Sequence, residues 1–196
     1  MTSKFDPLRR SLIAGSASAF AGLGYAATTP IPHDPFGRVE PAQPAPSLPL
    51  IQDDARQADL AQLLRGKTTA VQLMFTGCSA TCPIQGALFA EVARRLPANG
   101  GLELLSLSID PLSDNPPALS AWLKKFGPSR LWRAAAPRVG DVDRLLDFLR
   151  GRSATADRHT AQVYLFDRQA RFVFRTPDLP PPAYVVTLLG EVASRG

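Results

Sequence analysis

The sequence predicts an α/β fold in which helices flank a central mixed, mostly parallel sheet. Apolar, β-prone runs alternate along the chain with segments whose apolar residues recur at helical spacing. Two of these runs, residues 69–75 and 102–109, are predominantly apolar, which is typical of strands buried on both faces. Strands that alternate with helices favour a parallel-rich sheet covered by helices on both sides.

From residue 69 onwards the elements are expected in the order β-α-β-α-β-α-β-β-α. A short strand or hairpin at 48–51 and one or two helical turns at 58–64 are expected before them. Pro83 fits the first turn of the helix predicted over 82–96, because N–H groups there have no partner within the helix. The other elements expected are a strand at 102–109, a helix from 115–117 to Gly127, a short strand at 131–133, a helix at 139–149, two strands at 160–166 and 172–175 around a hairpin, and a last helix at 183–193.

The first 26 residues predict an export signal. Lys4, Arg9 and Arg10 precede an uncharged stretch over 12–24, and Gly24-Tyr25-Ala26 resembles a cleavage site. The stretch is shorter than the roughly 20 residues that a bilayer-spanning helix needs. The adjacent arginines favour a twin-arginine signal over a general secretory one. We therefore expect a periplasmic protein whose signal is cleaved near Ala26.

Residues 27–46 are rich in proline and predict an extended linker or a surface-hugging arm. His33 is expected there as a solvated linker residue, and the folded domain is expected over 47–196. The formal net charge is +5, but the chain has no dense basic run and no interleaved aromatic platform. A nucleic-acid partner is therefore not expected.

Cys78 and Cys82, the only two cysteines, lie where the strand at 69–75 is expected to turn into a helix. Residues four apart on a helix share one face, so both sulfurs can converge on one point. A helix N-terminus favours the thiolate form, which both redox exchange and soft metals require. A structural disulfide is a third possibility, but so small a loop constrains the unfolded chain little.

A histidine completes the candidate site. The order of elements, with the cysteine pair at the first strand-to-helix junction, resembles a thioredoxin-like domain, in which the loop entering the strand at 160–166 packs against the cysteine pair. His159 stands in that loop and is the only histidine after the linker. Two thiolates and one imidazole suit Cu(I) and can hold Cu(II), whereas a structural zinc usually has four protein ligands. Met74, Trp122 and Trp132 are expected in the core, and Asp110 is expected to cap a strand or support the site loop.

Several segments together resemble the Sco/SenC family of copper-binding, thioredoxin-like assembly factors for cytochrome c oxidase. The resemblance spans roughly residues 47–195 and is carried by Phe75-Thr76-Gly77-Cys78-Ser79-Ala80-Thr81-Cys82-Pro83, Ser108-Ile109-Asp110-Pro111, Asp114-Asn115-Pro116, Lys125-Phe126-Gly127-Pro128, and His159 before Val163-Tyr164-Leu165-Phe166-Asp167. It differs from the usual family pattern in the residues between the cysteines, where Ser79-Ala80-Thr81 lacks an acidic group.

The resemblance implies a periplasmic metallochaperone, rather than an enzyme, that binds one copper through Cys78, Cys82 and His159. The implied partner is the dinuclear (CuA) centre of oxidase subunit II or another periplasmic copper protein, with a copper donor or thiol reductant as a further partner. The alternative is a thiol–disulfide oxidoreductase in which Cys78 attacks and Cys82 resolves the mixed disulfide. That alternative does not require His159.

Overall fold

A computed structural model describes residues 36–127, 129–154 and 158–195 of the chain. The predicted export signal and His33 lie outside the described residues. The strands are β1 (Gly37–Pro44), β2 (Pro49–Gln52), β3 (Gln57–Asp59), β4 (Thr68–Met74), β5 (Leu102–Ser108), β6 (Trp132–Pro137), β7 (Val163–Phe166) and β8 (Arg171–Arg175). The helices are α1 (Leu60–Leu64), α2 (Thr81–Arg95), α3 (Pro116–Lys124), the 3-10 helix η2 (Val139–Asp141), α4 (Val142–Leu149) and α5 (Pro182–Arg195).

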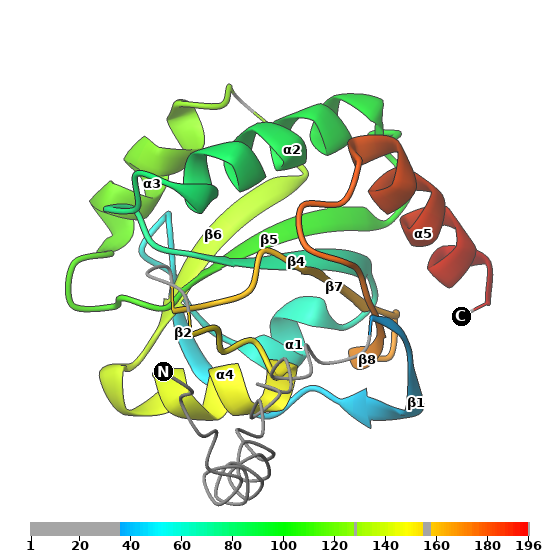
Figure 1. The fold of residues 1–196 in the computed structure, drawn as a ribbon, viewed down its shortest axis with the longest axis horizontal. Helices are drawn as coiled ribbons and strands as arrows, with labels where there is room; N and C mark the ends of the chain where they lie inside the picture. Colours follow the sequence, from blue (N-terminus) through cyan, green and yellow to red (C-terminus); the bar gives the residue numbers. More distant parts are fainter. Residues whose placement is uncertain (1–35, 128, 155–157, 196) are drawn as a thin grey trace, which may run out of the picture. The chain divides into compact units, whose positions relative to one another are not determined.

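Within the described residues these strands form one mixed sheet in the order β1-β8-β7-β4-β5-β6-β2-β3. The predicted α/β fold with a mixed sheet between helices is confirmed (Figure 1). The expected predominance of parallel pairs is wrong, because among the described strands only β4 with β5 and β5 with β6 pair in parallel, and β4 pairs antiparallel with β7 on its other side. β7 and β8 are joined by a short hairpin and therefore run antiparallel, and the strands at both ends of the sheet also pair antiparallel.

The segment predicted as a linker over 27–46 is partly a strand. β1 pairs antiparallel with β8, with Gly37 opposite Arg175, and Ala45 N–H donates to Ala170 O at 2.8 Å. Prolines are tolerated in β1 because it is an edge strand, on which missing N–H donors cost no sheet hydrogen bond. The surface-hugging arm is thus the correct alternative for this part of the segment, and the boundary predicted near Ser47 is too late in the chain.

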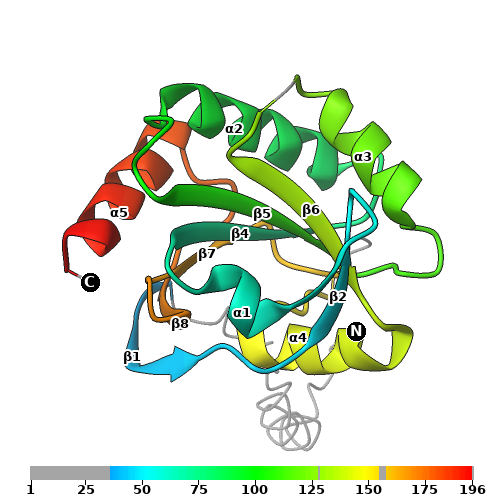
Figure 2. The same cartoon turned by 180° about the vertical axis from the view of Figure 1, so that it is seen from behind.

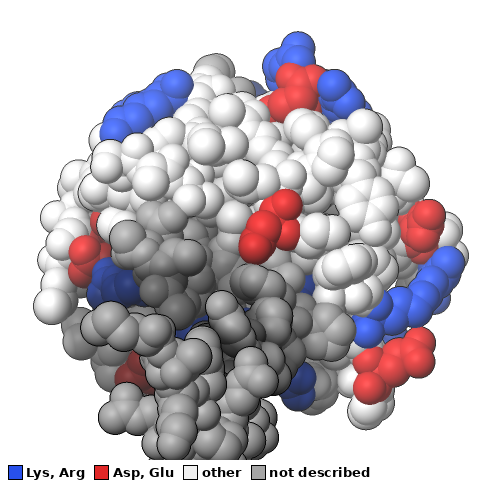
Figure 3. All heavy atoms as spheres, viewed as in Figure 1, with Lys and Arg blue, Asp and Glu red and all other residues white. Residues whose placement is uncertain are grey.

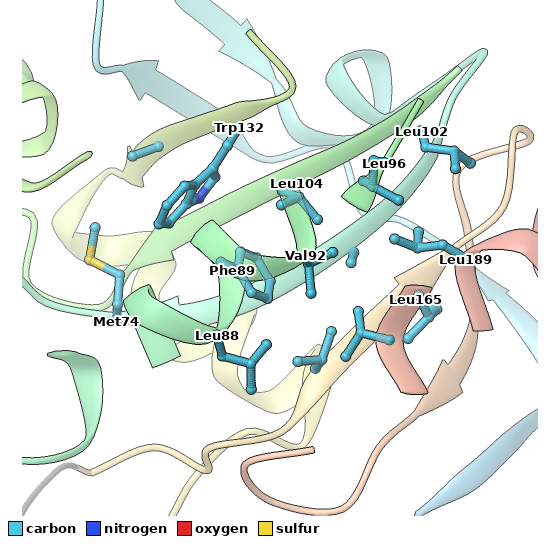
Figure 4. Packing of buried hydrophobic residues seen from close by; sticks show 14 of the residues in the cluster. Met74, Leu88, Phe89, Val92, Leu96, Leu102, Leu104, Trp132, Leu165 and Leu189 are labelled. Atoms are coloured by element: carbon cyan, nitrogen blue, oxygen red, sulfur yellow. The ribbon is translucent and has the colours of Figure 1, made fainter. Parts of the chain in front are cut away.

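Helices cover both faces of the sheet. α2, α3 and α5 lie over one face, and α1 and α4 lie over the other (Figures 1 and 2). Under α2, Phe89 packs against Trp132 with ring centroids 5.8 Å apart, beside Met74 and Val92 (Figure 4). Met74, Trp122 and Trp132 are buried as predicted. Trp132 Nε1 donates to Ser106 Oγ at 2.9 Å, which satisfies the polar atom of this buried ring.

Among the described helices, α1 and α3 begin with a side-chain cap, whereas α2, η2 and α4 do not. Asn115 caps α3 by accepting the N–H of Ala118 at 3.0 Å, and two prolines open that helix. α2 differs, because its N-cap residue Ala80 makes no side-chain capping bond. Parallel pairing of β4, β5 and β6 brings the carboxyl ends of these strands to one edge of the sheet. Ligand sites of α/β proteins commonly form at such an edge.

The described surface is mixed in charge. In Figure 3 most charged side chains lie near the periphery of the face shown, several with both signs side by side, and an acidic side chain lies near its centre; no large patch of one sign is visible among the described atoms. In addition, no helix of the described residues is both long enough and apolar enough to cross a membrane.

Candidate metal centre

The structure brings together side chains from three separate segments at the carboxyl end of β4. Cys78 lies in the connection from β4 to α2 and is half-buried, whereas Cys82 lies in the first turn of α2 and is fully buried. His159 lies between α4 and β7 and is only 3% exposed. The predicted packing of the histidine-bearing loop against the cysteine segment is therefore present.

Cys82 and His159 face each other. The Sγ of Cys82 lies 3.7 Å from Nε2 of His159, and Nδ1 of His159 lies 2.8 Å from the carbonyl oxygen of Thr160. A carbonyl oxygen only accepts hydrogen bonds, so this contact places the proton on Nδ1 when the ring is neutral. Nε2 then carries the lone pair and faces the Cys82 sulfur. An imidazole held in this tautomer is prepared to bind a metal ion through Nε2.

Cys78 interacts with the start of α2. The backbone N–H of Cys82 donates to Cys78 Sγ at 3.3 Å. The first N–H groups of a helix have no partner within the helix, and the N-cap residue of α2 supplies none. The Cys78 sulfur is the acceptor for one of these N–H groups, that of Cys82. Cys78 Sγ therefore lies at the N-terminus of α2, in contact with its first turn.

An aromatic ring closes one side of the site. The ring of Phe75 meets the imidazole of His159 edge-on, with centroids 6.1 Å apart. The guanidinium carbon of Arg158 lies over the same ring, 5.7 Å from its centroid. Phe75 thus separates the buried imidazole from an exposed positive charge. The sequence alone assigns no role to Phe75 or Arg158, because their contact joins two segments that are distant along the chain.

A short pair of extended segments holds His159. Arg152 and His159 form an isolated antiparallel bridge, and Thr160 N–H donates to Gly151 O at 2.9 Å. The Thr160 hydroxyl in turn lies 2.6 Å from the hydroxyl of Tyr164. Gly151 is tightly enclosed, since a Cβ there would lie 2.5 Å from Leu73 Cδ1. The backbone on both sides of the histidine is therefore fixed by the core beneath it.

A buried carboxylate organises the cysteine-bearing connection. Asp114 is 1% exposed and accepts the N–H of Thr76 at 3.1 and 3.2 Å, the Thr76 hydroxyl at 2.5 Å and the Ser108 hydroxyl at 2.6 Å. Thr76 is two residues before Cys78. The acidic side chain that supports the site loop is thus that of Asp114, whereas Asp110 was the residue expected in this role. Asp110 contributes through its carbonyl oxygen, which accepts the N–H groups of Ser113 and Asp114.

The three predicted ligands are neighbours but do not form a completed metal site. Among the described residues, no group of three His, Cys, Asp or Glu side chains is arranged to hold a metal ion. Cys82 and His159 already face each other, and Cys78 Sγ is instead directed to the N–H of Cys82. Binding through all three residues therefore requires at least one of these side chains to change position. The assignment of the three ligands stays a prediction.

Solved structures with this fold are similar to the chain at low sequence identity. The copper-bound ScoI of Bradyrhizobium japonicum is 21% identical, with a TM-score of 0.64 over 76% of this chain and 99% of that one. The copper-bound Sco1 of yeast is 20% identical, with a TM-score of 0.64 over 76% and 87%. BsSco, described as a Sco-family cytochrome c oxidase assembly protein with a disulfide switch, is 17% identical, with a TM-score of 0.66 over 79% and 96%. At sequence identities of 17–21%, these similarities establish that the fold is shared.

Sequence comparisons give the family. A comparison with curated proteins finds no significant match. The family model described as SCO1/SenC matches residues 43–193, which include Cys78, Cys82 and His159. The match covers most of the chain and begins at Gln43, near the end of β1. The chain therefore belongs to the SCO1/SenC family.

Proposed function

We propose that this protein is a periplasmic copper chaperone that carries one copper ion on Cys78, Cys82 and His159. The observation that carries the proposal is the contact of 3.7 Å between Cys82 Sγ and His159 Nε2, with the imidazole proton held on the opposite nitrogen. Family membership and the two copper-bound structures of the same fold support it. The predicted export signal supports the periplasmic location.

The donor set suits copper better than the other common metals. Two thiolates and an imidazole are soft and borderline ligands that favour Cu(I) and also accommodate Cu(II). A structural zinc site would need a fourth protein ligand. Cys82 and His159 are buried, so the half-buried Cys78 is the ligand with room to move toward them. On binding, Cys78 Sγ would give up its hydrogen bond from the Cys82 N–H and bind the copper ion, which the protein carries as cargo.

The proposed recipient is a protein with its own cysteine and histidine ligands. BsSco, which has the same fold, is described as a member of a family of cytochrome c oxidase assembly proteins. We therefore propose the CuA site of oxidase subunit II as the target, with another periplasmic copper protein as the alternative. Copper passes by ligand exchange, in which ligands of the target replace Cys78, Cys82 and His159 in turn. A copper donor loads the protein, and a thiol reductant keeps both cysteines reduced, because a disulfide offers no thiolate.

An anaerobic Cu(I) competition titration of the reduced protein tests the proposal. One-to-one binding is expected, with affinity lost in Cys78→Ser and Cys82→Ser and lowered about 10- to 100-fold or more in His159→Ala. Gly140→Ala is a matched control, because a Cβ at this position meets no atom within 4 Å. Unfolding in urea shows whether each variant is folded. An unchanged Cu(I) affinity in a folded His159→Ala variant would remove the histidine from the site.

The second candidate function is thiol–disulfide exchange, which the N–H contact to Cys78 Sγ favours. The Cys78 thiolate would attack a target disulfide and form a mixed disulfide, releasing one target thiolate. The Cys82 thiolate would then attack Cys78, which releases the second target thiolate and leaves a Cys78–Cys82 disulfide. A periplasmic thiol reductant must supply two electrons to restore the pair. Reduction of a target disulfide that survives in His159→Ala, together with weak copper binding, would select this function.

A further inference from the structure

Gln85 is a buried polar side chain one helical turn after Cys82. It lies on α2, three positions after that cysteine, and is 1% exposed. Neither Nε2 nor Oε1 of its amide makes a hydrogen bond to any residue that the structure describes. Burying an amide without a hydrogen bond is destabilising, and most buried amides are therefore bonded. We expect the amide of Gln85 to acquire a partner in another state of the protein.

The surroundings of Gln85 on α2 are apolar. Leu88 and Phe89, on the next turn of the helix, lie among the buried apolar side chains between α2 and the sheet (Figure 4). Cys82 belongs to the same cluster. An apolar residue would suit position 85 in such a cluster. Cys82 is the member whose side chain would carry a negative charge after binding copper, because thiolate is the form that binds the metal.

The helix places the amide of Gln85 on the side of Cys82. Residues three apart share one face of a helix, with about 5–6 Å between their Cβ atoms, a separation that a glutamine side chain can span. Side chains on a helix also lean toward its N-terminus, over the preceding turn. Gln85 makes no hydrogen bond to the Cys82 sulfur in the described structure, and a thiol sulfur is only a weak acceptor. Hydrogen bonds to ionised acceptors are about twice as strong as those between neutral groups, so a thiolate is the better acceptor.

A second glutamine offers a different partner. Gln72 on β4 is fully buried and lies on the same face of the strand as Met74, two residues further along. Its Nε2 donates to Ser106 Oγ at 2.9 Å, whereas its Oε1 has no partner among the described residues. A bond between Gln85 Nε2 and Gln72 Oε1 would stabilise the fold without involving the cysteine. The two arrangements make different predictions for a variant that lacks the Gln85 amide.

We propose that Gln85 donates an N–H hydrogen bond to Cys82 Sγ when this sulfur binds copper as a thiolate, and that the bond favours Cu(I) over Cu(II). The proposal rests on the proposed function. An N–H donor withdraws electron density from the sulfur, which weakens its donation to Cu(II) more than to Cu(I), and hydrogen bonds around a copper-bound cysteine sulfur are known to tune the redox potential of the metal. Gln85 is thus a positioning residue that acts through Cys82 and does not itself bind the metal.

Gln85→Leu tests the proposal, because it removes the amide, keeps a similar volume and adds no copper ligand. The Cu(I) dissociation constant is measured by anaerobic competition, and the sulfur-to-copper charge-transfer band is recorded for the Cu(II)-loaded protein. Cu(I) affinity is expected to fall about tenfold. The band is expected to move to longer wavelength, because loss of the N–H bond raises the energy of the sulfur lone pair. Leu88→Val is the control: it alters packing on the next turn of α2 without touching an amide, and it should leave the band in place.

Urea unfolding of the copper-free protein separates the two partners of Gln85. If its amide has no partner until copper binds, the midpoint of Gln85→Leu equals or exceeds that of the original chain. A lower midpoint with an unmoved band would assign the amide to Gln72 and overturn the proposal. An unmoved band with unchanged Cu(I) affinity would overturn it as well, and would leave the chaperone function in place. Gln85→Ala replaces Gln85→Leu in all three measurements if the leucine variant does not fold.

The original chain judges the proposed function separately. One-to-one Cu(I) binding by the original chain, with weaker binding and a shifted band in the folded Gln85→Leu variant alone, supports the role of Gln85. Failure of the original chain to bind Cu(I) would overturn the chaperone function and the role of Gln85 with it.

Discussion

Asp114→Ala is expected to loosen the cysteine-bearing connection and to destabilise the protein. The carboxylate accepts hydrogen bonds from three groups: Thr76 N–H, the Thr76 hydroxyl and the Ser108 hydroxyl. Hydrogen bonds to a charged group contribute about 1.5–3 kcal/mol each. The two hydroxyls can turn toward other acceptors, whereas the Thr76 N–H cannot. We therefore expect the free energy of unfolding to fall by about 3 kcal/mol, less than the sum of the three bonds.

The comparison with Asp110 makes the expectation specific. Asp110 lies in the same turn, and in the part of the chain that the structure describes its carboxylate accepts no hydrogen bond, so Asp110→Ala is expected to change stability by less than about 0.5 kcal/mol. Asp114→Asn keeps one acceptor oxygen and is expected to lose about 1–2 kcal/mol. Urea unfolding followed by tryptophan fluorescence measures all three variants. Equal losses in Asp114→Ala and Asp110→Ala would refute the reasoning.

The same network has a consequence for copper. Residues that orient metal ligands typically change metal affinity about 10- to 100-fold when they are replaced. Asp114 contacts Thr76, and Thr76 is two residues from Cys78. Cu(I) affinity is therefore expected to fall about tenfold in Asp114→Asn, under conditions where the variant remains folded. An Asp114→Asn variant with reduced stability and full Cu(I) affinity would show that the network stabilises the fold without orienting Cys78.

Three further substitutions test the support of His159 and the packing of α2. Gly151→Ala places a Cβ 2.5 Å from Leu73 Cδ1 and 2.9 Å from Tyr164 Oη; a stability loss of about 1–3 kcal/mol is expected in urea, with Cu(I) affinity lowered as His159 shifts. Tyr164→Phe removes the hydroxyl that contacts Thr160 and should cost about 1 kcal/mol in the same assay. Gly86→Ala places a Cβ 2.2 Å from the Phe126 ring, so the free energy of unfolding is expected to fall by about 1–3 kcal/mol, as for Gly151→Ala. The Cu(I) affinity of Gly86→Ala is expected to stay unchanged. A Gly151→Ala protein as stable as the original chain would contradict the tight enclosure of this residue.

The fold is predictable where the chain carries a strong local pattern. The runs at 69–75 and 102–109 are β4 and β5, and the apolar spacing after Cys82 is α2. The prolines of β1 are typical of a linker, and its pairing with β8 depends on residues more than 100 positions away. The residues of β1 and its neighbours along the chain do not indicate that β8 is the pairing strand. For the same reason the expected predominance of parallel pairs fails where β1 pairs with β8, β7 with β4 and β2 with β6, all of them antiparallel.

The candidate site is predictable in its residue types and only partly in its geometry. A cysteine pair at a strand-to-helix junction is visible in the sequence, and the placement of His159 follows from the resemblance to thioredoxin-like domains. The roles of Asp114, Gly151 and Tyr164 are not visible there. Each depends on a contact between segments that meet only after folding. A buried Asp between a strand and a helix start is a weak signal, because Asp is also common in solvated turns.

The burial and hydrogen bonds of His159 distinguish the two candidate functions better than the two cysteines do, because both functions use the cysteines. A dithiol that only exchanges disulfides needs no imidazole beside its buried sulfur. Here the histidine is buried, its Nδ1 proton is donated to Thr160 O, and its backbone bridges Arg152. The N–H of the next residue, Thr160, is donated to Gly151 O. Burying an imidazole costs free energy unless its nitrogens have partners. With Nδ1 bonded to Thr160 O, Nε2 faces Cys82 Sγ at 3.7 Å, and these are the two buried atoms that the copper proposal assigns as ligands.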